Sequence, residues 1–192
     1  MLRDSRDPAY YDRFASLRSY LGADPRTTGL PENEIDCLER AFAMHEVGTV
    51  PAPYAQALHR LRETHRLGVV SNIFCKSGLY LLEFDRADVL GLFDVVVFSS
   101  DHGHIKPSAY IFETALKAFS ADRSKVVFVG DSLKRDVAGA GAVGLSTVWI
   151  NAMNAAPEPG SPGPDLVIRD LRDLLESPGP FNAETQRGKE KD

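Results

Sequence analysis

The chain has 192 residues, 43% of them hydrophobic and 26% charged, which is the composition of an ordinary globular protein, since single domains commonly run to about 100 to 200 residues. Its 22 Lys and Arg and 27 Asp and Glu give a net charge of -5, and the basic residues form no stripe, so we expect no nucleic-acid partner. No apolar stretch is long enough for a signal peptide or a membrane span, and Cys37 and Cys75 are too few for a disulfide framework. We therefore expect a protein of the reducing cytoplasm without a membrane segment.

The first 65 residues are predicted to be helical. Asp7 and Pro8 suit the N-cap and first position of a helix that continues to Gly22, with apolar residues at helical spacing along it. A second helix is expected near Pro31 and a third from about Tyr54.

From residue 67 onward, short apolar runs alternate with amphipathic helical patterns. The apolar runs lie at 67–70, 94–98, 126–129, 147–151 and 166–168. This alternation predicts an α/β fold with a Rossmann-like parallel sheet that carries helices on both faces. The Pro- and Gly-rich run at 155–164 is expected to be a surface loop, and residues 177–192 a disordered tail.

Polar residues follow three of the predicted strands where each strand ends. Ser71 and Asn72 follow the first, Lys106 comes shortly after the second, and Asp131 with Asp136 follows the third. Ligands of parallel sheets gather at the carboxyl ends of the strands, so we expect these side chains to meet. A hydroxyl can hold a phosphate oxygen, an ammonium can offset its charge, and carboxylates can hold Mg²⁺, which together favours phosphoryl chemistry.

In this order and spacing, segments 67–72, 106–112 and 127–136 resemble three motifs of the haloacid dehalogenase (HAD) superfamily of hydrolases, most of which are phosphatases. The resemblance covers about residues 50 to 175. It implies a HAD-like fold with a small helical cap at 1–50, a core at 51–176 and the tail at 177–192.

The resemblance also implies a role for each matched residue. Ser71 and Asn72 would bind the transferring phosphoryl group, and Lys106 would stabilise its charge and that of the nucleophile. Asp131 would ligate Mg²⁺, while Asp136 would orient metal-bound water or the Lys106 side chain. The expected partner is a small phosphorylated metabolite.

One motif of the superfamily has no counterpart in the sequence. It is an apolar strand that ends in a nucleophilic Asp and lies between the strands that end at Ser71 and Asp131; upstream of Asp7 there is only Met1 to Arg6. We therefore expect a sheet without its first strand and an incomplete version of an active enzyme. The alternative is a natural remnant in which the two flanking strands pair directly.

The leading hypothesis is thus a Mg²⁺-dependent phosphatase that uses an aspartyl-phosphate whose nucleophile is missing from this chain. Two alternatives are a catalytically inactive phosphate-binding or interaction module and a haloacid dehalogenase, which needs the same Asp but no metal.

Simpler interpretations also exist for single residues. Asp131 and Asp136 suit a helix N-cap and a surface carboxylate, His102 and His104 suit exposed loop positions, and Cys75 suits packing.

Overall fold

The computed structural model describes residues 8–157, 160 and 163–176. The predicted tail and part of the predicted loop at 155–164 lie outside the described residues.

The strands confirm the predicted parallel α/β fold. They are β1 (Leu67–Ser71), β2 (Phe93–Phe98), β3 (Val127–Gly130), β4 (Ser146–Ile150) and β5 (Leu166–Ile168). All their pairings are parallel, with Val69 opposite Val96 and Val129 opposite Val148. Short runs of β-branched residues favour such buried strands.

The described strands form two separate groups. One contains β1 and β2, and the other contains β3, β4 and β5 in that order. Among the described residues, β1 pairs with β2 alone and β3 with β4 alone. The alternative in which the two strands that flank the missing one, β1 and β3, pair directly is therefore not found among the described residues.

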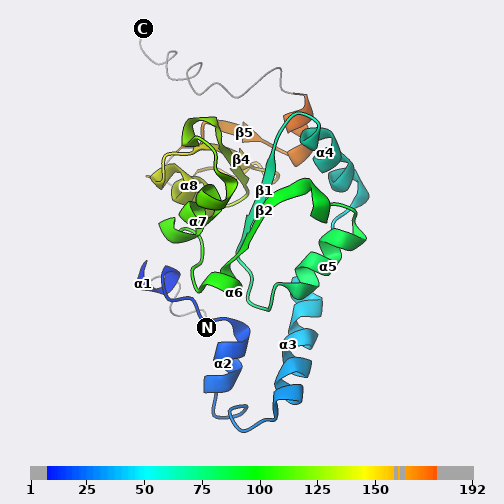
Figure 1. The fold of residues 1–192 in the computed structure, drawn as a ribbon. Coiled ribbons are helices and arrows are strands. Elements are labelled where there is room, and N and C mark those ends of the chain that lie inside the picture. The colour runs from blue at the N-terminus through cyan, green and yellow to red at the C-terminus, as the bar shows by residue number, and fades with distance from the viewer. Residues whose placement is uncertain (1–7, 158–159, 161–162, 177–192) are drawn as a thin grey trace.

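Helices surround the strands (Figure 1). The α-helices are α1 (Pro8–Tyr11), α2 (Leu17–Ala23), α3 (Glu32–Glu46), α4 (Ala52–Arg62), α5 (Gly78–Arg86), α6 (Ser99–His102), α7 (Ala109–Phe119) and α8 (Ala138–Ala142). Short 3-10 helices are η2 (Leu90–Leu92), η3 (Arg123–Lys125) and η5 (Leu171–Leu175), and a π-helical turn, η4 (Leu133–Val137), leads into α8. No helix of the described residues is both long and apolar enough to cross a bilayer.

The single helix predicted from Asp7 to Gly22 is wrong, because the chain leaves the helix after Tyr11 and starts α2 at Leu17. Two backbone contacts draw the intervening segment onto the core, since the amide of Phe14 donates to the Gly103 carbonyl at 2.8 Å and that of Leu17 to the Phe74 carbonyl at 2.9 Å. Ser16 then acts as the N-cap of α2. The apolar periodicity is shared between two helices separated by a bend.

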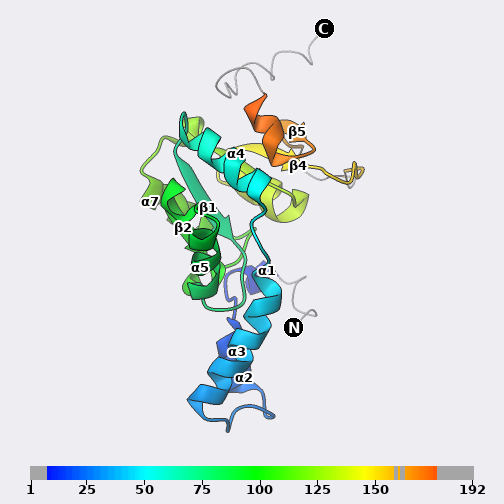
Figure 2. The same cartoon turned by 90° about the vertical axis from the view of Figure 1, so that its right-hand side faces the viewer.

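Two apolar clusters hold the elements together. The first joins β2 to α7 and α8 and contains the fully buried Ile111 and Phe112; burying such a side chain contributes about 1.5–3 kcal/mol. The second joins α2, α3 and α5 to the end of β2 and contains Ile73 and Cys75 from the loop after β1. Both views show α2 and α3 extending away from the strands, at the end opposite β5 (Figures 1 and 2). This second cluster therefore attaches the helical extension formed by α2 and α3 to the loop that follows β1.

Two glycines of α8 make a matched test of the packing between α7 and α8. A Cβ on Gly139 would lie 2.7 Å from Cε2 of Phe112, whereas a Cβ on Gly141 would meet nothing within 4 Å. We predict that Gly139→Ala lowers the free energy of unfolding by about 1–3 kcal/mol, because overpacking forces neighbours to move. Gly141→Ala should leave it unchanged or raise it by up to about 1 kcal/mol, the helix-propensity gain of Ala. Urea unfolding measures both, and equal effects of the two substitutions would contradict the packing described.

Candidate functional site

The residues predicted from three strand ends line one cavity of about 190 Å³. Its walls are Ser71, Asn72, Lys106, Asp131, Arg135 and Asp136. Ser71 is the last residue of β1, Asp131 directly follows β3, and Asp136 lies within η4. The structure thus brings together all five residues predicted for the site and adds Arg135. The only signal for Arg135 was a basic residue next to Asp136 in sequence.

Lys106 is the centre of this arrangement. Its Nζ lies 2.7 Å from Oδ1 of Asp136 and donates to the carbonyl oxygen of Val70 in β1 at 2.9 Å. The side chains of Lys106 and Asp136 are 13% and 5% exposed, so the pair is largely removed from water. Lys106 therefore connects β1 with the turn that follows β3.

Asp136 is held on its other oxygen as well. Its Oδ2 accepts the amide of Ser132 at 2.9 Å, and the glycine at position 130 leaves room for it, because a Cβ there would lie 2.5 Å from the Asp136 Cβ. The simpler interpretation of Asp136 as a surface carboxylate is wrong. The interpretation of Asp131 as a helix N-cap is also wrong, because Ser132 is the N-cap of η4 and its Oγ accepts a hydrogen bond from the Arg135 amide.

The side chain of Asn72 fixes the backbone of Lys106. Its Oδ1 accepts the Lys106 amide at 2.8 Å, and its Nδ2 donates to the Lys106 carbonyl at 3.2 Å. Both ends of the side-chain amide are thereby used. The loop after β1 and the segment that carries Lys106 consequently form one unit.

The donors in the cavity fit a Mg²⁺ ion of the kind that proteins bind through few carboxylates. Asp131 is exposed, and its carboxylate makes no hydrogen bond or ion pair with the described residues, while its carbonyl accepts Nε1 of Trp149 at 3.0 Å. The described residues contain no cluster of three or more His, Cys, Asp or Glu that could enclose an ion. Mg²⁺ is commonly held by one or two carboxylates and completed by water and substrate phosphate. The Asp131 carboxylate fits this role, whereas both oxygens of Asp136 are already engaged by Lys106 and the Ser132 amide, so Asp136 fits a supporting role beside the ion.

The neighbouring histidines and cysteine have other surroundings. His102 and His104 are half-buried rather than exposed, and His104 stacks on Tyr110 with ring centroids 3.8 Å apart. Cys75 is buried, and burial, with the nearby Glu46 carboxylate, raises the pKa of its thiol to about 12. A thiol in this state is not a nucleophile, which agrees with a packing role.

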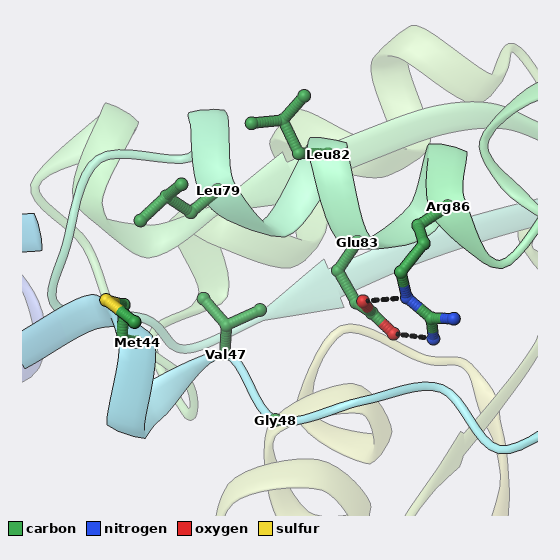
Figure 3. Close-up of a pocket in the computed structure, with 7 residues that line it drawn as sticks. All are labelled: Met44, Val47, Gly48, Leu79, Leu82, Glu83 and Arg86. Atoms are coloured by element: carbon green, nitrogen blue, oxygen red, sulfur yellow. Dashed lines mark hydrogen bonds and ion pairs between the residues drawn. The ribbon is translucent and has the colours of Figure 1, made fainter.

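A larger hollow of about 290 Å³ lies between the end of α3 and α5 (Figure 3). Met44, Val47, Leu79 and Leu82 form its apolar part. Its charged residues, Glu83 and Arg86, are paired with each other at 2.6 Å. None of the residues predicted for phosphoryl chemistry lines it.

The two cysteines provide a simple test of these surroundings. The chain has only Cys37 and Cys75, one exposed and one buried. At pH 8 the Cys75 thiol should stay protonated, because its pKa of about 12 lies well above that pH, and only the thiolate reacts. We predict that iodoacetamide labels Cys37 alone in the folded protein and both residues in urea. Mass spectrometry measures the labelling, and rapid modification of native Cys75 would contradict the structure.

The Lys106–Asp136 pair should contribute strongly to stability. We predict that Asp136→Asn lowers the free energy of unfolding by about 3 kcal/mol or more, because it leaves a buried cation without its partner. Asp131→Asn is the matched control on the same turn and should stay within about 0.5 kcal/mol, since an exposed carboxylate without a partner among the described residues contributes little. Denaturant unfolding compares the variants, and equal stabilities would show that the ion pair is not formed.

Comparison with known proteins places these features in context. A family model described as HAD-hydrolase-like matches residues 105–174. The chain is 35% identical over 141 residues to the pyrimidine 5'-nucleotidase YjjG of Escherichia coli, an alignment that covers 71% of this chain and 61% of that protein. The chain therefore spans less than two thirds of this relative.

Solved structures show the same fold. A HAD phosphatase from Thermococcus onnurineus is 34% identical, with a TM-score of 0.54, and the match covers 63% of this chain and 54% of that one. A 2-haloacid dehalogenase from Pseudomonas syringae is 25% identical, with a TM-score of 0.65 over 90% of this chain and 74% of that one.

Proposed function

Because this chain belongs to the haloacid dehalogenase-like (HAD) superfamily of hydrolases, we propose that it serves in the Mg²⁺-dependent hydrolysis of a small phosphomonoester. One observation carries the proposal: residues from the segments that follow β1, β2 and β3 line a single small cavity, and they include a largely buried ammonium. A phosphate group is a small anion with several acceptor oxygens, and such a cavity matches it in charge and in donors. Both cysteines are free thiols, which supports the cytoplasm as the proposed location.

The proposed roles follow from the contacts of each side chain. The Ser71 hydroxyl donates to a phosphoryl oxygen, and the Lys106 ammonium offsets the negative charge that the group carries. Asp136 keeps Lys106 in place and Asn72 fixes its backbone, as their hydrogen bonds support. Asp131, assisted by Asp136, holds Mg²⁺, which supplies positive charge to the phosphoryl oxygens when bound.

The nucleophile is proposed to be an aspartate on a strand between β1 and β3. Its carboxylate oxygen attacks phosphorus, the ester P–O bond breaks, and the leaving oxygen takes a proton; water then cleaves the aspartyl-phosphate and releases inorganic phosphate. Among the described residues, no strand pairs with both β1 and β3, which belong to different strand groups. The described residues therefore provide the phosphoryl site, and this strand would complete it.

Turnover with and without an added strand tests the proposal. We predict that the 192-residue chain with Mg²⁺ does not hydrolyse p-nitrophenyl phosphate, because no described strand places an aspartate between β1 and β3. An N-terminal extension that adds an apolar strand ending in Asp should produce turnover that EDTA abolishes. The matched control is the same extension ending in Asn, which can pair with the sheet but cannot attack phosphorus. Turnover by the unextended chain at the rate of the extended one would overturn the proposed nucleophile.

A second candidate is a phosphate-binding module without catalysis. The division of the described strands into two groups favours this non-catalytic candidate, because no described strand joins the two groups and places an aspartate at the cavity. Calorimetry would then detect phosphate or Mg²⁺ binding, and neither extension would give turnover. Haloacid dehalogenation, suggested by the Pseudomonas syringae neighbour, would instead appear as halide release from 2-chloropropionate by the extended chain without Mg²⁺.

A further inference from the structure

Four consecutive amides of the loop that follows β1, those of residues 73–76, are bound by side chains from other elements. The amide of Ile73 donates to Oγ of Ser99 at 2.8 Å, and that of Lys76 donates to Oε1 of Glu39 at 3.1 Å. Between them, the amides of Phe74 and Cys75 donate to the two carboxylate oxygens of Glu46 at 3.0 and 3.3 Å. Three of these four consecutive amides are thus held by carboxylates of α3.

Both carboxylates come from one face of α3, because Glu39 and Glu46 are separated by two helical turns. Glu39 is only 5% exposed and is also bound by Nε of Arg18 in α2 at 3.1 Å. Burying a carboxylate is costly unless hydrogen bonds or a counter-charge satisfy it. The loop amides donate hydrogen bonds to both carboxylates, and Arg18 supplies a counter-charge to Glu39. The two acids therefore belong to the contact between α3 and the loop.

The held loop begins directly after the phosphoryl-site residues Ser71 and Asn72. The side chains of Ile73 and Cys75 are 2% and 1% exposed and lie in the same apolar cluster as Ala43 of α3. Because Asn72 also fixes the backbone of Lys106, a shift of this loop would reach the cation of the cavity.

We propose that Glu46, supported by Glu39, is a positioning residue for the phosphoryl site, and that α3 sets the places of Ser71, Asn72 and Lys106 through this loop. Neither acid lines the cavity, so its effect passes through the backbone. The proposal rests on the proposed function in one respect, that the cavity binds phosphate.

The test uses the full chain, inorganic phosphate as the ligand, and calorimetry for its dissociation constant. Glu46→Ala should weaken phosphate binding about tenfold or more, because small displacements of binding groups have large effects. Glu46→Gln keeps one acceptor oxygen and should weaken binding by a smaller factor, which is the conservative rescue. Glu34→Ala, on the exposed side of the same helix, is the matched control and should bind as the original chain does.

Amide hydrogen exchange of residues 71–76 accompanies the binding measurement and is independent of it. Faster exchange in Glu46→Ala that includes Ser71 and Asn72 supports the positioning role, whether or not phosphate binds. Exchange that rises at Phe74 and Cys75 alone, with unchanged phosphate affinity, overturns it. Absence of phosphate binding by the original chain would overturn the proposed function, and the exchange at Ser71 and Asn72 would then decide the positioning role by itself.

Discussion

The site depends on a lysine ammonium that is kept in a largely buried place by two oxygens from different parts of the chain. Lys106 reaches the Val70 carbonyl in β1 and the Asp136 carboxylate after β3. These strands belong to separate hydrogen-bonded groups, so the lysine bridges two groups that share no ladder. Removing the partner of a buried cation is strongly destabilising. Here the absence of a side chain at Gly130 leaves room for Asp136, and the Ser132 amide holds its carboxylate.

Contacts extend outward from this lysine in a continuous series. Asn72 fixes the Lys106 backbone, the loop after Asn72 is held by Glu46 and Glu39, and these acids belong to a helix that lies away from the strands (Figure 2). The cavity is therefore supported from both the sheet and the helical extension. Each of β1 and β3 has one strand neighbour among the described residues, so each has a second edge at which the proposed strand could pair.

Much of this could be predicted from the sequence, because short apolar runs that alternate with helical patterns and end in polar residues are typical of buried parallel strands. The strand positions and the meeting of Ser71, Lys106 and Asp131 follow from local pattern and from the common edge of parallel strands. Contacts between distant segments could not be predicted. The bend at Phe14 depends on Gly103, and the half-burial of His104 depends on its stacking with Tyr110. Glu39 and Glu46 would ordinarily be taken as a solvated helix face, since only the folded chain places loop amides beside them.

The affinity of the folded chain for inorganic phosphate, compared between two lysine substitutions, tests the account most directly. Lys106 lines the cavity, whereas Lys134 is exposed, with its Nζ 5.8 Å from the centroid of the Tyr11 ring. Replacing either lysine by Met removes one positive charge, so the two variants differ in the position of the lost charge and not in net charge. We expect Lys106→Met to weaken phosphate binding by about a hundredfold, which corresponds to about 2.7 kcal/mol, and Lys134→Met to leave it almost unchanged. Equal weakening by both substitutions would mean that phosphate responds to overall charge rather than to the bridging lysine, and would contradict the account.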